Sequence, residues 1–427
     1  MKTRCILLGL AAASQACMPG PAPASQPGDL IRKSEIPPPP TTTRISNVRV
    51  FNGDSFIGPQ DVLMHEGYII REISKCGDNK LNASSPQTTV IDGTGQYLIP
   101  GLIDSHAHVN SIGGLENFTS HGVTTVFNMN CANYTLCNAL QKPQRGLAAF
   151  LTAGHAAVAP GSPHAVTIHV APSDLYNETT QDPASWAAAV FGNNSDYVKI
   201  IAEPRGPSQK AQIGIVEATR KLGRKTMTHA SFLEPAAQAI ASKTDGIQHL
   251  PQDGLLSAAQ LTAIRHQNQT LTATIEINRL AATDPGILAF LGVTGANATA
   301  RGKAAYKMVQ ENARRAVAAG ITVLAGTDAI GDSFPGVSFP FGATLHDELV
   351  NLVAAGMTPA QALRAATEQP ARWYGLEDRG RVAPGRRADL VLLGTDPLAD
   401  ITNTQDIRRV WVGGVEYPHV VKRTVIM

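Results

Sequence analysis

Two histidines separated by one residue, His106 and His108, offer the clearest chemistry in this chain. They end an apolar run at residues 98–108 (LIPGLIDSHAH), which predicts a β-strand leading straight into the pair. Because alternate residues of a strand point the same way, both imidazoles should project together at the strand's C-terminal end. Two neutral imidazoles can hold one divalent ion. A hydrogen-bonded structural pair is the alternative, and the preceding Pro-Gly-Leu-Ile-Asp favours the metal site.

Four further residues stand where other predicted strands end: Lys199, His229, His249 and Asp328. Taken singly, each has an ordinary explanation, such as an exposed lysine, a hydrogen-bonded histidine or an aspartate that caps a helix. Their recurrence at strand ends along the chain favours a single site to which all of them contribute.

The elements that must position these residues follow a regular alternation. From residue 100 to residue 376, short apolar runs, such as 198–201 and 321–325, alternate with Ala-rich helical segments. This alternation predicts an α/β fold, a (β/α)8 TIM barrel whose active site lies at the C-terminal ends of its strands. Thr358, Pro359 and Gln361 supply an N-cap, a proline at the first helical position and a capping-box residue.

Toward the two ends of the chain, residues 44–99 and 377–427 show a different pattern, in which short apolar runs are separated by turn-forming residues. This pattern predicts short strands joined by turns. We expect these two parts to meet in one small β-domain, with the barrel inserted between them. Residues 17–43 are Pro-rich and should form an extended linker.

Three motifs together resemble the amidohydrolase superfamily, in particular its imidazolonepropionase-like members, which include proline dipeptidases and fungal ochratoxinase. They are residues 98–108, residues 355–367 (AGMTPAQALRAAT) and residues 380–391 (GRVAPGRRADLV). The resemblance covers roughly residues 44–420. It implies a distorted (β/α)8 barrel, a β-sandwich formed by both chain ends, and a site for two divalent metal ions, zinc being the expected metal.

The resemblance also implies the metal ligands, which are His106, His108, Lys199, His229, His249 and Asp328. The His-x-His pair and Asp328 would hold the more buried ion, and His229 with His249 would hold the second. Lys199 would carry a CO2-derived carbamate that bridges both ions. An ordinary lysine, with a pKa of about 10.4, is a cation that repels metals, whereas two nearby dications favour the neutral amine.

The same resemblance assigns roles in catalysis. Asp328 would take a proton from the attacking water and give it to the leaving amine. His155, in the segment 152–155 (TAGH), would contact the substrate carbonyl or its oxyanion. The segment after Lys199 departs from the family pattern, so Glu203 and Arg205 point to a different substrate. His164 and His169 match no motif and favour loop or core positions, and His346 favours a polar first helical turn.

The first residues are typical of an export signal, with Lys2 and Arg4 before an apolar stretch and a cleavage site after Ala16. A short apolar start to a cytosolic protein, or a lipoprotein modified at Cys17, are the alternatives. The expectation is therefore a secreted protein from a fungus or another eukaryote. If exported, Cys131 and Cys137 could pair. The candidate glycosylation sites are Asn82, Asn117, Asn133, Asn177, Asn193, Asn268 and Asn297.

The bulk composition excludes other classes of protein. The net charge of +2 gives no reason to expect a nucleic-acid partner, and no apolar run reaches the length of a membrane span. We expect a small-molecule substrate, while a homo-oligomer remains open. The leading hypothesis is hydrolysis of an amide or peptide-like C–N bond. The alternatives are another reaction at the same metals (decarboxylation, lactone or ring opening) and a non-catalytic barrel relative.

Overall fold

The computed structural model describes residues 42–73, 88–131, 133–334 and 337–421. The expected signal peptide and all but the last two residues of the expected linker lie outside the described residues, as do Cys76 and Asn82. The first described residue, Thr42, already begins a strand.

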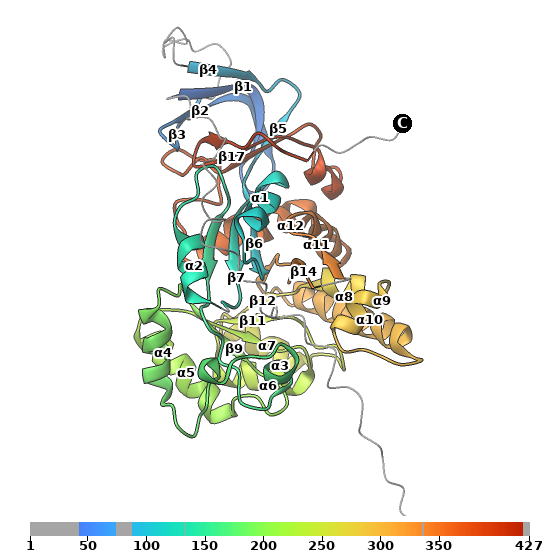
Figure 1. Cartoon of the computed structure of the whole chain (residues 1–427). Helices are drawn as coiled ribbons and strands as arrows, with labels where there is room; N and C mark the ends of the chain where they lie inside the picture. Colours follow the sequence, from blue (N-terminus) through green and yellow to red (C-terminus); the bar gives the residue numbers. More distant parts are fainter. Residues whose placement is uncertain (1–41, 74–87, 132, 335–336, 422–427) are drawn as a thin grey trace, which may run out of the picture.

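An eight-stranded mixed sheet contains strands from both ends of the described chain, in the order β18-β17-β16-β5-β1-β2-β3, with β4 paired to β1. Figure 1 shows β1 to β5, in blue, beside β17, in red. The strands are β1 Thr42–Phe51, β2 Phe56–His65, β3 Tyr68–Ile73, β4 Thr88–Asp92, β5 Tyr97–Pro100, β16 Leu390–Leu393, β17 Ile407–Val412 and β18 Val415–Glu416. Its core includes Val48, Leu98 and Trp411, which are all buried.

Eight of the remaining strands are parallel and lie in two sheets. The first is β6-β7-β8 (Leu102–Ala107, Val123–Asn128 and Ala149–Thr152). The second has the spatial order β13-β12-β11-β10-β9, and its strands are β9 Val198–Ile201, β10 Thr226–His229, β11 Gly246–Gln248, β12 Thr270–Thr272 and β13 Val323–Leu324. A short antiparallel hairpin, β14 Gly331–Phe334 with β15 Val337–Phe339, follows them. The fold is thus mixed α/β with parallel sheets.

Isolated parallel bridges join the two parallel sheets at both edges. Ala157, just after β8, pairs with Ile200 of β9, and Ala107 at the end of β6 pairs with Ala329 beyond β13. The N–H of Ser105 also donates to the carbonyl oxygen of Ala325 (3.0 Å). The C-terminal ends of the strands therefore share one region of the molecule. The prediction that Lys199 ends its strand was wrong, because β9 continues to Ile201 and Lys199 is its second residue.

Helices connect the parallel strands and cover them (Figure 1). They are α1 Ile112–Ser120, α2 Tyr134–Gln141, α3 Pro163–Thr167, α4 Pro183–Gly192, α5 Gln209–Lys221, α6 Leu233–Ser242, α7 Ala258–His266, α8 Ile275–Ala281, α9 Pro285–Phe290, α10 Ala298–Ala318, α11 Ala343–Ala354, α12 Pro359–Ala365 and α13 Glu368–Trp373, with 3-10 turns η3 Pro172–Asp174 and η4 Ile401–Gln405. The predicted capping box of Thr358 and Gln361 is confirmed, because both reciprocal hydrogen bonds form.

Candidate metal centre

The His-x-His pair lies at the end of β6, where both side chains are fully buried. Asp104 accepts hydrogen bonds from the N–H of His106 (3.0 Å) and from the N–H and hydroxyl of Thr327 (3.1 and 2.7 Å). Burial raises the pKa of Asp104 to about 7, although these hydrogen bonds act to lower it. Asp104 thus ties the end of β6 to the segment that carries Asp328.

Asp328 reaches the pair through an unusual backbone turn. Its φ of 67° is left-handed, and its N–H donates to the carbonyl oxygen of His106 (2.7 Å). A Cβ at Gly326 would lie 2.9 Å from the backbone nitrogen of His106, so this close approach requires glycine. Oδ1 of Asp328 consequently lies 3.2 Å from Nε2 of His106 and 3.1 Å from Nε2 of His108.

The electrostatics of these three side chains suit a metal ion. Burial lowers the pKa of His106 to about 3, helped by Lys199 and opposed by Asp328, and burial also lowers the pKa of His108. Both imidazoles are therefore neutral near pH 7 and keep a lone pair for coordination. Burial alone would raise the pKa of Asp328, but the histidines, His106 first, outweigh it and hold this pKa well below its usual range.

The orientation of the two imidazole rings also suits the binding of a cation. Nδ1 of His106 lies 2.8 Å from Oε1 of Gln248, so it carries the hydrogen and leaves Nε2 as an acceptor. Nε2 of both histidines and Oδ1 of Asp328 are buried without a hydrogen-bond partner among the described residues. Of the His, Cys, Asp and Glu side chains in the described ranges, these three alone form a group whose ligand atoms all lie within 4.8 Å of one another.

The other predicted ligands lie beside this group. The ring of His249 is 4.8 Å from that of His106 and 4.6 Å from that of His229, measured between centroids. Nδ1 of His249 contacts the hydroxyl of Thr274 (2.8 Å). Lys199 on β9 is completely buried, and its charge acts, after burial, to lower the pKa of His106, His229 and His249. The structure therefore brings all six predicted ligands into one buried region.

His155 lies outside this cluster. Its ring stacks on Tyr134 with centroids 4.2 Å apart, and its Nδ1 is 3.7 Å from Oδ1 of Asp174. The pKa of His155 is lowered, because the effect of burial exceeds the opposing effect of the charge of Asp174. The ring contact, hydrogen bond and ion pair of His155 are with Tyr134 and Asp174, which are not predicted metal ligands.

The structure places a different histidine, His164, against a predicted metal ligand. His164, at the start of α3, is fully buried, and its ring packs edge-on against His229 with centroids 4.7 Å apart. Its Nδ1 lies 2.6 Å from Oε2 of Glu203. The sequence allowed a core position for His164 but gave no sign of this neighbourhood. The one available signal was the unusual Glu203 just after the strand of Lys199.

Two other histidines complete the comparison with the sequence. His169 is exposed, in agreement with the predicted loop position. The prediction for His346 was wrong, because its side chain is buried where α11 packs against η4 and the end of α1. Nδ1 of His346 contacts the hydroxyl of Thr404 (2.9 Å), and its Nε2 contacts the carbonyl oxygen of His121 (3.0 Å).

Comparison with known proteins identifies the family. The sequence profile of the amidohydrolase family matches residues 97–416. The chain belongs to the amidohydrolase family. It is therefore a hydrolase acting on carbon–nitrogen bonds, in a family that is typically metal-dependent.

Individual proteins show how far the similarity of this amidohydrolase extends. An imidazolonepropionase from Deinococcus deserti is 28% identical over 260 residues, which span 58% of this chain and 56% of that protein. One from Salinispora arenicola is 24% identical over 367 residues, spanning 81% and 89%. The crystal structure of a Xaa-Pro dipeptidase with bound methionine superposes with a TM-score of 0.73 at 19% identity, covering 88% of this chain and 99% of that one. Ochratoxinase from A. niger gives 0.69 at 19% identity, covering 88% and 95%.

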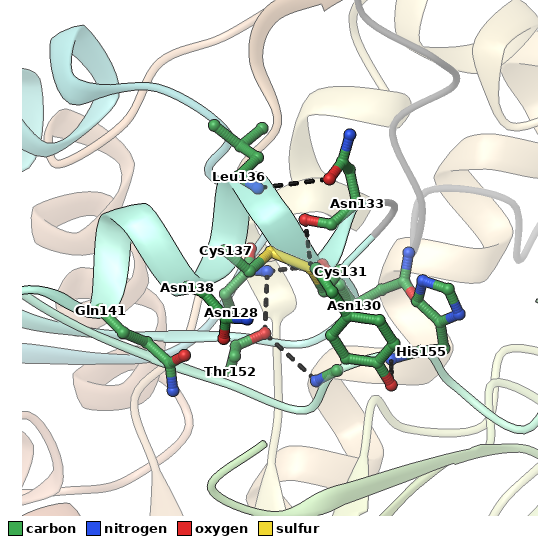
Figure 2. Close-up of a disulfide and its surroundings, with 12 residues drawn as sticks. Asn128, Asn130, Cys131, Asn133, Leu136, Cys137, Asn138, Gln141, Thr152 and His155 are labelled. Atoms are coloured by element: carbon green, nitrogen blue, oxygen red, sulfur yellow. Dashed lines mark hydrogen bonds between the residues drawn. A yellow bond between two sulfur atoms is a disulfide. The ribbon is translucent and has the colours of Figure 1, made fainter. Parts of the chain in front are cut away.

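A disulfide joins Cys131 to Cys137 in the amidohydrolase, next to the Tyr134–His155 stack. Figure 2 shows this bond with Asn133, whose side-chain oxygen accepts from the N–H of Leu136 (3.2 Å). The N–H of Cys131 donates to the carbonyl oxygen of Gly154 (2.8 Å), which fastens the loop to the segment after β8.

The candidate glycosylation sites lie at the surface where the structure describes them. Asn177 is half-buried, and the exposed ones are Asn117, Asn133, Asn193, Asn268 and Asn297. No helix in the described ranges combines the length and the apolar character that crossing a membrane requires.

Proposed function

We propose that this amidohydrolase holds two divalent metal ions, zinc being the expected metal, and cleaves an amide or peptide-like C–N bond of a small molecule. One observation carries this proposal: the buried acceptor atoms of His106, His108 and Asp328 converge on one point at the ends of their strands. The dipeptidase among the structural neighbours supports peptide-like substrates.

The second ion would be held by His229 and His249, with Lys199 bridging the two ions as a carbamate. Packing of the two imidazoles at 4.6 Å supports a shared ion, and the complete burial of Lys199 beside histidine ligands supports the modification. A carbamate would replace a buried positive charge with an anionic oxygen donor, which is better suited to bind cations.

The scaffold we propose is a distorted (β/α)8 barrel of β6 to β13, with a β-sandwich built from residues 44–99 and 377–427. The parallel bridges Ala157–Ile200 and Ala107–Ala329 support closure of the eight strands into a barrel. In such barrels, side chains at the C-terminal ends of the strands carry the chemistry.

The chain's own residues would divide the work of hydrolysis. Bound ions would supply Lewis-acid chemistry, lowering the pKa of a water molecule and polarising the scissile carbonyl. Asp328 would hold the proton of the attacking water and return it to the leaving nitrogen. His164, whose Nε2 is buried without a hydrogen-bond partner among the described residues, would meet the substrate beside the scissile bond. Contact of His155 with the substrate carbonyl or its oxyanion, the role expected from the sequence, is kept as an alternative hypothesis.

We also propose that the protein is secreted and glycosylated. The Cys131–Cys137 disulfide supports this, since such bonds persist in oxidising compartments. The exposed sequon asparagines support it as well. Mass spectrometry of the secreted protein, with and without glycosidase treatment, would test both statements.

The decisive test combines metal analysis with a substrate screen. Purified protein should contain close to two zinc or similar ions per chain, and 13C-bicarbonate should give a carbamate signal that is lost in Lys199→Ala. N-acyl amino acids, X-Pro dipeptides and aryl amides would then be screened for amine release. A folded preparation that takes up no metal and releases no amine contradicts the proposal.

A further inference from the structure

The strongest unexplained feature of the molecule is the contact between His164 and Glu203. The glutamate accepts two hydrogen bonds from this one residue, from its backbone N–H (3.1 Å to Oε1) and from Nδ1 of its ring (2.6 Å to Oε2). The exposed fractions of the two side chains are 0% and 1%. Both carboxylate oxygens are thereby used to hold one histidine.

A tight turn directs Glu203 toward this contact. The N–H of Gly206 donates to the carbonyl oxygen of Glu203 (2.8 Å), and Arg205 has a left-handed φ of 62°. Pro204 followed by a left-handed residue is the pattern of a type II turn. A Cβ at Gly206 would lie 2.7 Å from the carbonyl oxygen of Ile201, so the turn packs closely against β9. Glu203 is therefore fixed to the strand that carries Lys199.

The hydrogen bonds determine which ring nitrogen of His164 is available. A carboxylate can only accept, so Nδ1 must carry a hydrogen. Nε2, on the other side of the ring, is buried and has no hydrogen-bond partner among the described residues. The ring lies against that of His229, which is a predicted metal ligand. His164 is not one of the six ligands that the family resemblance implies, so its Nε2 is available to a substrate beside the proposed metal site.

We propose that Glu203 is a positioning residue: it fixes the tautomer and orientation of His164, so that Nε2 meets the polar group of the substrate next to the scissile bond. This inference rests on the proposed amide hydrolysis. Because the ring cannot turn without breaking its bond to a buried carboxylate, His164 is held in place before substrate arrives.

A ring-tautomer measurement tests the positioning without using catalysis. In zinc-loaded protein labelled with 15N-histidine, NMR should show His164, assigned by its loss in His164→Ala, with hydrogen on Nδ1. In Glu203→Ala this signal should shift toward a mixture of tautomers. A wild-type His164 that carries hydrogen only on Nε2 overturns the inference, whether or not amide hydrolysis is found.

Kinetics with the best substrate of the screen test the consequence. Glu203→Ala should lower kcat about 100-fold with little change in KM or metal content, and Glu203→Gln, which keeps one acceptor, should be intermediate. In a His164→Ala background, Glu203→Ala should change kcat less than twofold, because the glutamate acts only through the histidine. The matched control Asp174→Asn should stay within threefold of wild type. Equal effects in both backgrounds, or loss of bound metal, overturn the inference.

Discussion

Two histidine–carboxylate pairs use histidines of the segment that follows β8, and they differ in burial and in the distance between the two groups. The inner pair, His164 and Glu203, has exposed fractions of 0% and 1% and a 2.6 Å contact. The outer pair, His155 and Asp174, has exposed fractions of 20% and 32% and a separation of 3.7 Å. The same chemical groups therefore form a fixed contact in one place and a loose one in the other.

The comparison indicates that the burial and contacts of a histidine ring are better evidence of its role than the sequence motif in which it stands. A solvent-exposed ion pair typically contributes less than about 1 kcal/mol. Removing one partner of a buried pair can cost about 3–5 kcal/mol, because the other is left buried without compensation. On this ground we propose that the inner pair, rather than the outer one, holds an atom in place for catalysis. Four predictions test this comparison.

The largest effect is expected at His106, His108 and Asp328, because either histidine–carboxylate pair can contribute to catalysis only if this proposed metal site does. Asp328→Asn should lower kcat by about 10³-fold or more, because an amide can neither take up the water's proton nor supply an anionic ligand. Steady-state kinetics on the best substrate would measure this loss, and metal analysis should find the ion at His229 and His249 largely retained. A variant with a near-normal rate would show that Asp328 does not hold the proton. The proposal that the inner pair acts beside a catalytic metal site would then lose its support.

The next effect compares the two histidines directly. His164→Asn should lower kcat/KM by about 10²-fold or more, the typical loss for one donor or acceptor at the reacting group. His155→Asn should change it less than about threefold, since its contacts are with Tyr134 and Asp174. Both variants should keep their metal content. The reverse order of effects would restore the role that the sequence assigned to His155.

The site itself was largely predictable because strands impose simple rules. Alternation along β6 brings His106 and His108 to the same side. Lys199 within β9, His229 at the end of β10 and Asp328 beyond β13 lie near the same edge of the parallel strands. Each of these residues stands at a place that the short apolar runs mark in the sequence. Strand periodicity therefore predicted where these side chains gather, whereas the resemblance to the amidohydrolase superfamily implied their roles as metal ligands.

The rest could not be predicted because it depends on the paths of loops. His164 and Glu203 are 39 residues apart, and their contact requires both α3 and the turn at Gly206 to take their observed courses. His346 was expected in a polar helical turn, but packing of α11 near η4 buries it against Thr404. No local pattern encodes such encounters between distant segments.

A smaller effect is expected from the disulfide that supports the outer pair. Replacing Cys131 and Cys137 together by serine should lower the free energy of unfolding by on the order of 2 kcal/mol, the entropy expected for a loop this short. Tyr134, inside the loop, stacks on His155, so the loss should loosen the outer pair while kcat changes little. Urea unfolding and kinetics would measure the two quantities, with reductant-treated wild type as control. A large loss of kcat in the folded variant would show that the outer pair matters to catalysis.

The smallest effect concerns a buried histidine that has no carboxylate partner. Burial, and to a smaller extent the charge of His121, lower the pKa of His346 from 6.5 to about 3. In His155, by contrast, the charge of Asp174 opposes the lowering of the pKa by burial. Below pH 6.5 the unfolded state therefore binds more protons at His346 than the folded state, so stability falls as the pH drops. Between pH 7 and 5.5 this one group should remove about 1 kcal/mol. Urea unfolding at both pH values should find a drop smaller by that amount in His346→Gln, because the remaining buried histidines contribute equally to both proteins. An identical drop would mean that the pKa of His346 in the folded protein is close to its value in the unfolded chain. Burial without a carboxylate partner would then not be enough to lower the pKa of a histidine.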